Sequence, residues 1–202
     1  MMLAMEKVSS ARPREGALTE AVMGIVAEHG LDRVSVREVA AAAGVSIGTV
    51  QHYFPTKERL LAAAYTEAVR RIRDRLEALR LGPDPRANLI RVLRQLLPLD
   101  ERRRTETRVY VAFAAGAATS PALAEIQQDI LTELHAGLSD AFVLAWHGAA
   151  SAHRCRLAAH AVIALVDGLA LHAVTTEHWL GSRQLTATVE LVLAALLDER
   201  VP

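Results

Sequence analysis

A hydroxyl, an amide, an imidazole and a phenol lie close together in the segment GVSIGTVQHYFPTKERL, and they belong to Thr49, Gln51, His52 and Tyr53. The surrounding stretch Ile47 to Tyr53 has helical character over about seven positions, too few for a helix that is stable alone. Glutamine can bridge an adenine edge, hydroxyl groups reach phosphates or bases, and apolar groups contact thymine methyls. The mixture is typical of a surface that reads the major groove of DNA.

A preceding short helix is predicted to support this segment. Ser35 and Glu38 have the spacing of a capping box, in which each side chain satisfies a free amide at the start of a helix. The helix is expected over Val36 to Ala43, and Gly44 then supplies a turn conformation that a Cβ would penalise. Two short helices joined by a glycine-containing turn form a helix-turn-helix.

The second helix of this motif is bounded by Ser46, which suits an N-cap, and by Pro55, which stops it. The motif's core is predicted to include four small apolar side chains: Val39, Ala40, Val45 and Val50. Phe54 is also expected in the core. Seven positions are then left outward: Ser46, Ile47, Gly48, Thr49, Gln51, His52 and Tyr53. Lys57, in the first turn of the next helix, adds a cation beside free backbone amides, which suits a phosphate.

The rest of the chain also predicts helices. Of its 202 residues 51% are hydrophobic and only 4% aromatic, so the core is mostly Ala, Leu and Val, which favours helices over sheets. Besides the two short helices, periodicity and capping residues place helices at about 13–29, 57–80, 84–97, 100–117, 120–146, 151–178 and 182–199. The expected fold class is all-α, with an N-terminal three-helix domain that carries the motif and a C-terminal helical bundle.

The composition also indicates the compartment. The single cysteine, Cys155, excludes an internal disulfide and favours a reducing environment. The N-terminus lacks the apolar core of a signal peptide. The most apolar stretch, Leu157 to Ala173, is interrupted by His160, Asp167 and His172, so no membrane span is predicted. We therefore expect a soluble, cytoplasmic protein.

The patterns that would indicate an enzyme are missing. His153, His160 and Asp167 recur every seven residues, a helical rise of about 10.5 Å per step, so they cannot share one metal ion. The sequence has no GxSxG, no phosphate-binding glycine loop and no CxxC. We expect no catalytic residues, no metal site and no cofactor.

The segment VSVREVAAAAGVSIGTVQHYFPTKERLL resembles the DNA-binding segment of the TetR/AcrR family of bacterial transcriptional regulators, and the resemblance covers about Leu18 to Tyr65. It implies that the third helix enters the major groove, that phosphates are held by Thr49, Tyr53 and Lys57, and that base edges lie near Arg37, Ile47, Gly48, Gln51 and His52. His52 stands where this family often has tyrosine. Because the formal net charge is zero, binding would depend on a few placed contacts rather than on a broad basic field.

The family forms twofold dimers through its last two long helices, here about 151–178 and 182–199. The segment LTATVELVLAALL is apolar nearly all round, which demands burial on more than one side. A stripe of mostly small residues on the preceding helix would permit close approach: Ala158, Ala161, Leu165, Gly168 and His172. The dimer would hold its recognition helices about 34 Å apart, one turn of DNA.

Residues of about Leu97 to Gln127 more loosely resemble the C-terminal domain of the BetI-like branch, which implies an effector-binding domain. Candidate effector-binding residues are the few large or polar ones in this aliphatic region: Tyr110, Phe113, His135, Phe142, Trp146, Asp167 and His172. Ordinary packing is the alternative for each. Asp167 needs a partner if buried, and an arginine, a backbone group or a cationic ligand would serve.

The sequence therefore predicts a DNA-binding domain at 11–60, with the reading motif at about 34–54, and a ligand-binding and dimerisation domain at 61–202. The predicted function is a ligand-responsive repressor that releases a palindromic operator when a small molecule binds the C-terminal domain. Two alternatives stay open: an activator of the same fold, and a helical module that docks protein rather than DNA. The effector, the operator and the regulated genes are not specified by the sequence.

Overall fold

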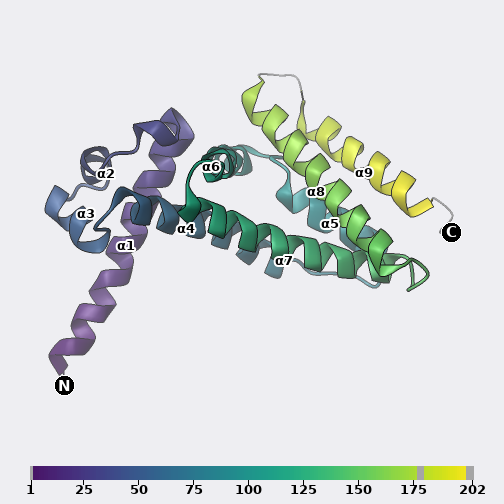
Figure 1. The fold of residues 1–202 in the computed structure, drawn as a ribbon, viewed down its shortest axis with the longest axis horizontal. Helices are drawn as coiled ribbons and strands as arrows, with labels where there is room; N and C mark the ends of the chain where they lie inside the picture. The colour runs from purple at the N-terminus through teal and green to yellow at the C-terminus, as the bar shows by residue number, and fades with distance from the viewer. Residues whose placement is uncertain (1, 177–179, 199–202) are drawn as a thin grey trace. The chain divides into compact units, whose positions relative to one another are not determined.

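The computed structural model describes residues 2–176 and 180–198, with side chains from residue 14 onward. Within these ranges the chain forms nine α-helices and one 3₁₀ turn, without a strand (Figure 1). The first elements are α1 (Met2–His29), η1 (Leu31–Arg33), α2 (Val36–Ala42), α3 (Ile47–Tyr53) and α4 (Lys57–Glu77). The others are α5 (Pro85–Leu96), α6 (Glu101–Ala117), α7 (Pro121–Ala145), α8 (Ala152–Thr175) and α9 (Ser182–Asp198). The all-α prediction is confirmed.

Three predicted details of the helices were wrong. Helix α1 begins at Met2, not at Pro13. The prediction used the preference of proline for the first turn of a helix, but in the structure Pro13 lies inside the helix. The 3₁₀ turn η1 was not predicted. Helix α4 ends at Glu77 rather than near residue 80. Just after Glu77, the Leu79 amide donates a hydrogen bond to the Leu76 carbonyl (3.1 Å), which makes a tighter turn than an α-helix. The predicted helices 151–178 and 182–199 end at residues 178 and 199. Residues 177, 178 and 199 lie outside the described residues.

The residues through Arg70, together with Val109–Gln127, form one compact unit. In it α1 packs against η1 and α2, and α2 packs against α3. The buried face of α1 contributes Leu18, Val22 and Val26, the apolar stripe of the predicted first helix. This unit therefore holds the complete helix-turn-helix.

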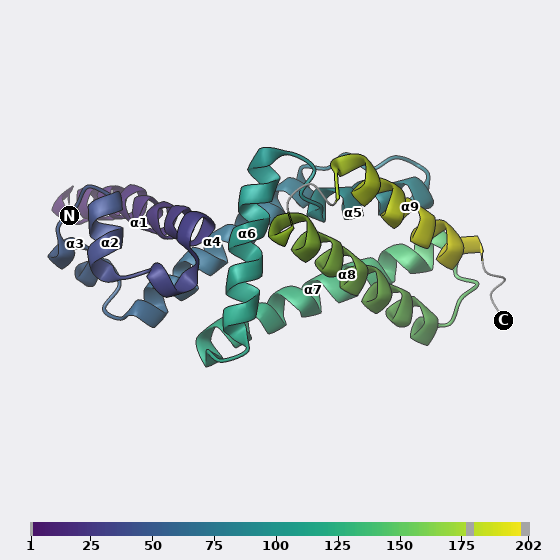
Figure 2. The same cartoon turned by 90° about the horizontal axis from the view of Figure 1, so that it is seen from above.

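Arg71–Arg108 and the residues from Gln128 onward form the second unit. Helices α8 and α9 pack against each other and both contact α5; Figures 1 and 2 show α8 running beside α9. One apolar cluster fills this unit, with large contributions from α5, α7, α8 and α9 such as Leu93, Phe142, Val162 and Leu193. Helices α4, α6 and α7 contribute residues to both units, so the polypeptide crosses between them three times.

Helix α8 is long and apolar enough to cross a membrane by length and composition alone, and the sharply bent pair α6 and α7 would pass the same test as one span. Many apolar residues of α8 are instead buried against other helices of its own chain, including Cys155, Val162 and Val166. The helix therefore has the character of a core helix.

Candidate DNA interface

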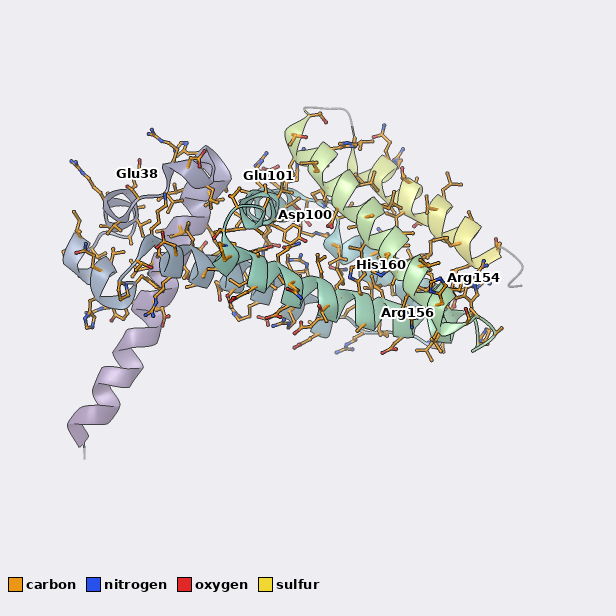
Figure 3. The ribbon with its side chains drawn as sticks, in the orientation of Figure 1. Glu38, Asp100, Glu101, Arg154, Arg156 and His160 are labelled. Carbon is orange, nitrogen blue, oxygen red and sulfur yellow. The ribbon has the colours of Figure 1, made fainter. Side chains whose placement is uncertain are left out.

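Local hydrogen bonds set the start of α2. The Ser35 hydroxyl accepts a hydrogen bond from the Glu38 amide (3.2 Å) and caps the helix as predicted. The reciprocal half of the capping box differs from the prediction, because the Ser35 hydroxyl donates to the Glu38 carboxylate (3.1 Å), which also lies 3.8 Å from Arg33. Glu38, labelled in Figure 3, thereby fastens the first turn of α2 to the end of η1.

The turn between α2 and α3 depends on Gly44. Its φ of +66° lies in the left-handed region, where a side chain would be strained. The Val45 amide donates to the Ala40 carbonyl (3.0 Å) and closes the C-terminus of α2. Ser46 then caps α3 by accepting from the Thr49 amide (3.1 Å). The start of this seven-residue helix is thus fixed by the turn and by its serine cap.

The motif buries four of its five predicted apolar side chains and leaves a polar face exposed. Val39, Val50, Ala40 and Phe54 are buried, whereas Val45 is only half-buried. The exposed residues of the face are Ser46, Ile47, Gly48, Gln51 and His52, and Thr49 and Tyr53 are half-buried. Ile47 keeps 47% of its surface exposed, an unusual position for a large apolar side chain in this unit. We call these seven residues the reading face.

In the described part of the chain, few contacts involve the polar groups of the reading face. The Ser46 and Thr49 hydroxyls lie 2.9 Å apart and can share a hydrogen bond, while His52 meets Tyr53 edge to face with ring centroids 5.3 Å apart. Gln51 makes no side-chain hydrogen bond or ion pair with any of the described residues. Its amide is available to a partner outside the chain.

Two cations stand beside this face in the sequence, and both are exposed. Lys57 opens α4, whose first turn is capped by the Thr56 hydroxyl, an acceptor for the Arg59 amide (3.2 Å). A hydrogen bond from its own backbone amide, followed by one with Thr56, lowers the pKa of the Glu58 carboxyl. Arg37 projects from α2; in the described part of the chain neither Arg37 nor Lys57 forms a side-chain hydrogen bond or ion pair.

The predicted effector-binding residues fall in both units. Tyr110 and Phe113 lie in the first unit with Tyr65 of α4, which stacks on Phe113 (ring centroids 4.9 Å apart, interplanar angle 10°). The Tyr65 hydroxyl donates to the Gln127 side-chain carbonyl, and the Gln127 amide donates to the Tyr110 hydroxyl (3.4 Å). Gln127 was not singled out by its sequence, because its two partners are distant in the chain.

In the second unit the structure brings several of the other candidates close together. The imidazoles of His135 and His160 lie with ring centroids 4.1 Å apart, joining α7 to α8 (Figure 3 labels His160). Burial raises the pKa of the Asp167 carboxyl, and the neighbouring His135 acts in the opposite direction. His172 is exposed near the end of α8.

Phe142 and Trp146 pack at the end of α7, with ring centroids 5.1 Å apart. The guanidinium of Arg154, labelled in Figure 3 near the start of α8, lies 5.5 Å from the centre of the Trp146 ring. Trp146 is buried, and its indole N–H has no hydrogen-bond partner within the described residues. Such a donor suits a ligand acceptor or a water molecule.

Helices α8 and α9 leave an apolar face uncovered. Its exposed residues on α8 are Leu157, His160, Ala161, Ala164, Leu171 and His172, and on α9 they are Ala187, Leu191, Ala194 and Ala195. Leu191 keeps 70% of its surface exposed. Ala158, expected on this face, is buried in its own chain, because the cluster around α5 and α9 takes that side of α8. We call these ten residues the α8–α9 face.

Across residues 2–176 and 180–198, no group of three or more His, Cys, Asp or Glu side chains is arranged to hold a metal ion. The pairing of His135 with His160 is thus a contact of two rings, and the Asp167 carboxyl interacts electrostatically with His135.

Comparison with known proteins agrees with this arrangement. Residues 18–64 match the model of the tetR family of bacterial regulatory proteins, and residues 85–198 match the C-terminal region of BetI-type transcriptional repressors. The HTH-type transcriptional regulator PksA of Bacillus subtilis is 30% identical over 80% of this chain and 78% of its own length. The HTH-type transcriptional regulator BetI of Yersinia pestis is 31% identical over 87% of this chain and 88% of its own.

Among solved structures, a transcriptional regulator from Rhodococcus sp. Rha1 superposes with a TM-score of 0.85 at 38% identity, covering 93% of this chain and 99% of that one. The motif match lies on α1–α4, and the C-terminal match spans α5–α9. The chain thus belongs to the TetR family and is a DNA-binding transcriptional regulator with a BetI-type C-terminal region.

Proposed function

We propose that this regulator is a repressor that binds a palindromic operator as a homodimer and releases it when a small molecule binds the C-terminal region. The observation that carries the proposal is the reading face: a capped seven-residue helix that buries Val50 and turns Gln51 and His52 outward. A helix of this length is not stable in isolation, and here the rest of the domain holds it in place. Its exposed amide and imidazole therefore point to a role in contact with another molecule. No catalytic role is assigned to any residue, and the protein acts in the cytoplasm.

The individual contacts follow from side-chain chemistry. Thr49, Tyr53 and Lys57 bind phosphates, because hydroxyls and a lysine at a helix start suit them and fix the register of the helix. Gln51 reads adenine, Ile47 contacts a thymine methyl, and His52 adds a hydrogen-bonding group to a base edge. The remaining members of the interface are Arg37, Ser46 and Gly48, which lie near base edges or along the groove. The domain boundary belongs near residue 60, so that 11–60 binds DNA and 61–202 binds the ligand and the second copy.

Dimerisation uses the last two long helices, about residues 151–178 and 182–199, through the α8–α9 face. Leucines exposed on both helices favour contact with an equally apolar surface, and a twofold axis supplies the same face from a second copy. The alanines between them allow close helix approach. Two recognition helices related by this axis then address two half-sites about one turn of DNA apart.

Effector binding is assigned to seven residues in the C-terminal region: Tyr110, Phe113, His135, Phe142, Trp146, Asp167 and His172. The buried indole N–H of Trp146, which has no partner among the described residues, and the half-buried Asp167 carboxyl favour a ligand that offers an acceptor and a positive charge. For release, that ligand must bind the state that does not bind DNA more tightly than the state that does.

The test is selection of duplexes from a random DNA library by the purified protein at about 0.15 M salt. Enrichment of an inverted repeat with half-sites about 10 base pairs apart is the expected result. Transcription from a promoter containing that repeat should fall when the protein is added. A dimer that enriches no sequence contradicts operator binding, and a rise in transcription would identify an activator.

A further inference from the structure

One helical glycine has two leucine side chains so close to it that they would have to move if it carried a side chain of its own. A Cβ on Gly116 of α6 would lie 2.7 Å from Leu31 Cδ2 and 3.2 Å from Leu123 Cδ1. Glycine is the poorest helix former after proline, so its presence inside a helix invites a packing explanation. Of the other helical glycines, Gly24, Gly137 and Gly168 have nothing within 4 Å of the corresponding position. Gly116 is therefore a point of close approach between three elements: η1, α6 and α7.

The residue that approaches Gly116 belongs to the reading motif's own support. Leu31 opens η1, which precedes α2 by two residues and is linked to it through Arg33 and Glu38. The Gly116 carbonyl accepts a hydrogen bond from the Ser120 amide (3.1 Å), which fixes the end of α6 against the start of α7. A shift of Leu31 would move the start of α2, and α3 with it, because α2 and α3 pack against each other.

The same helix is anchored at its other end to α8. Arg104 donates a hydrogen bond from its guanidinium to the Ala173 carbonyl at the end of α8, and Glu106 accepts one from Arg75 of α4. Helix α6 thus contacts the helix assigned to the dimer through Arg104 and the support of the reading motif through Gly116.

We propose that Gly116 is a positioning residue for operator binding: the missing side chain sets how closely η1 docks on α6, and thereby the spacing of the two recognition helices in the dimer. The inference rests on the proposed function, since it assumes a dimer that reads two half-sites. Neither Leu31 nor Gly116 contacts DNA in this proposal. Their contact only sets the geometry of the domain that does.

The test uses Gly116→Val, which adds a branched side chain at the Cβ position that lies 2.7 Å from Leu31 Cδ2, and Gly137→Val as the matched control, a helical glycine with nothing within 4 Å of that position. Both proteins are titrated against duplexes that carry the selected half-sites at the selected spacing and at spacings changed by one or two base pairs. We expect Gly116→Val to bind the original spacing about tenfold more weakly and to prefer a changed spacing. Dimer formation and affinity for random DNA should stay as in the parent, and Gly137→Val should keep the parent's spacing.

A compensating change separates positioning from simple damage. Shortening the opposing side chain, in Leu31→Ala combined with Gly116→Val, should recover affinity for the original spacing to within about threefold of the parent. If Gly116→Val does not fold, Gly116→Ala should show the same pattern more weakly, because the end of the Leu31 side chain can turn aside.

The inference is overturned if the Gly116 variants behave like their Gly137 counterparts. It is also overturned if they weaken all spacings alike without rescue by Leu31→Ala. Failure of the parent protein to select any inverted repeat would instead refute the proposed function, so the two failures are distinguishable.

Discussion

The reading face and the α8–α9 face are both uncovered surfaces of helices, yet their chemistry is opposite. The reading face is carried by a seven-residue helix and its serine cap, and its outward groups are mainly an amide, an imidazole, a phenol and hydroxyls. The α8–α9 face runs along helices of 24 and 17 residues and consists largely of leucine and alanine. Each surface is the outer side of a helix whose inner side is buried in its own unit.

The difference in polarity between the two faces indicates what each one requires from a partner. Exposed leucines gain free energy whenever water is removed from them, at about 25 cal/mol per Å² of apolar area, so a second apolar face suffices. Hydroxyl and amide groups gain little from burial alone and need matched donors and acceptors. One face therefore fits a second copy of the chain, and the other fits the edges of bases and the phosphates beside them.

The largest effect is expected from a charge placed in the apolar face. Leu191→Glu puts a carboxylate at its most exposed leucine, which would be desolvated against the second copy. We expect dissociation to monomers at micromolar concentration and a loss of operator affinity of about a hundredfold or more, since a monomer reads one half-site. Sedimentation velocity and fluorescence anisotropy with a labelled operator measure both.

Leu81→Glu is the matched control, because Leu81 is also exposed but lies between α4 and α5, outside the α8–α9 face. A dimer that survives Leu191→Glu but not Leu81→Glu would place the interface elsewhere.

On the reading face, the strongest change in sequence preference is expected from Gln51→Ala. If its amide bridges an adenine edge, each half-site loses about 1–3 kcal/mol of discrimination at one position. The dimer and its thermal unfolding should be unaffected, because Gln51 is exposed and its side chain is bonded to nothing in the described chain. Library selection with the variant should return the same repeat with one relaxed position per half-site. An unchanged repeat would remove Gln51 from base recognition.

A smaller and uniform effect is expected from Lys57→Met, which keeps most of the length of the side chain and removes its charge. Binding should weaken by about 1 kcal/mol for cognate and random duplexes alike, and the slope of log K against log salt should decrease by about one for each phosphate that the lysine no longer neutralises. Titrations at several salt concentrations measure this. A change in sequence preference without a change in slope would mean that Lys57 binds a base.

Local patterns were sufficient to predict the reading face in detail. The bounds Ile47–Tyr53 follow from a serine cap and a proline stop, and the left-handed turn follows from Gly44, so each depends on residues within a few positions. Three positions of the motif differ from the prediction: Val45 is half-buried rather than buried, and Thr49 and Tyr53 are half-buried rather than exposed. The burial of Val45 depends on neighbours beyond the turn.

Contacts between distant residues were beyond such patterns. Gly116 looks like any other helical glycine until Leu31, 85 positions earlier, is placed against it. Gln127 becomes notable only when Tyr65 and Tyr110 converge on it. Ala158 was placed on the wrong side of α8 because small residues line both its buried and its exposed sides, and packing against α5 and α9 decides between them. The assignments of individual DNA and effector contacts therefore stay predictions.

The smallest predicted effect concerns the one carboxylate in the apolar middle of α8. Burial raises the pKa of Asp167, so the folded chain keeps its proton at pH values where the unfolded chain, with an ordinary value of about 3.9, has released it. The wild type thus loses stability as pH rises through this window, and Asp167→Asn, which has no proton to lose, does not.

We expect the variant to be more stable than the wild type at pH 7 by no more than about 1 kcal/mol, because the half-buried group is partly screened by solvent. Below the window the two proteins should be equally stable. Chemical unfolding at fixed protein concentration from pH 3.5 to 7 measures the difference. A variant less stable than the wild type at pH 7 would mean that the carboxylate has a cationic partner in addition to His135, either in its own chain or in a bound molecule.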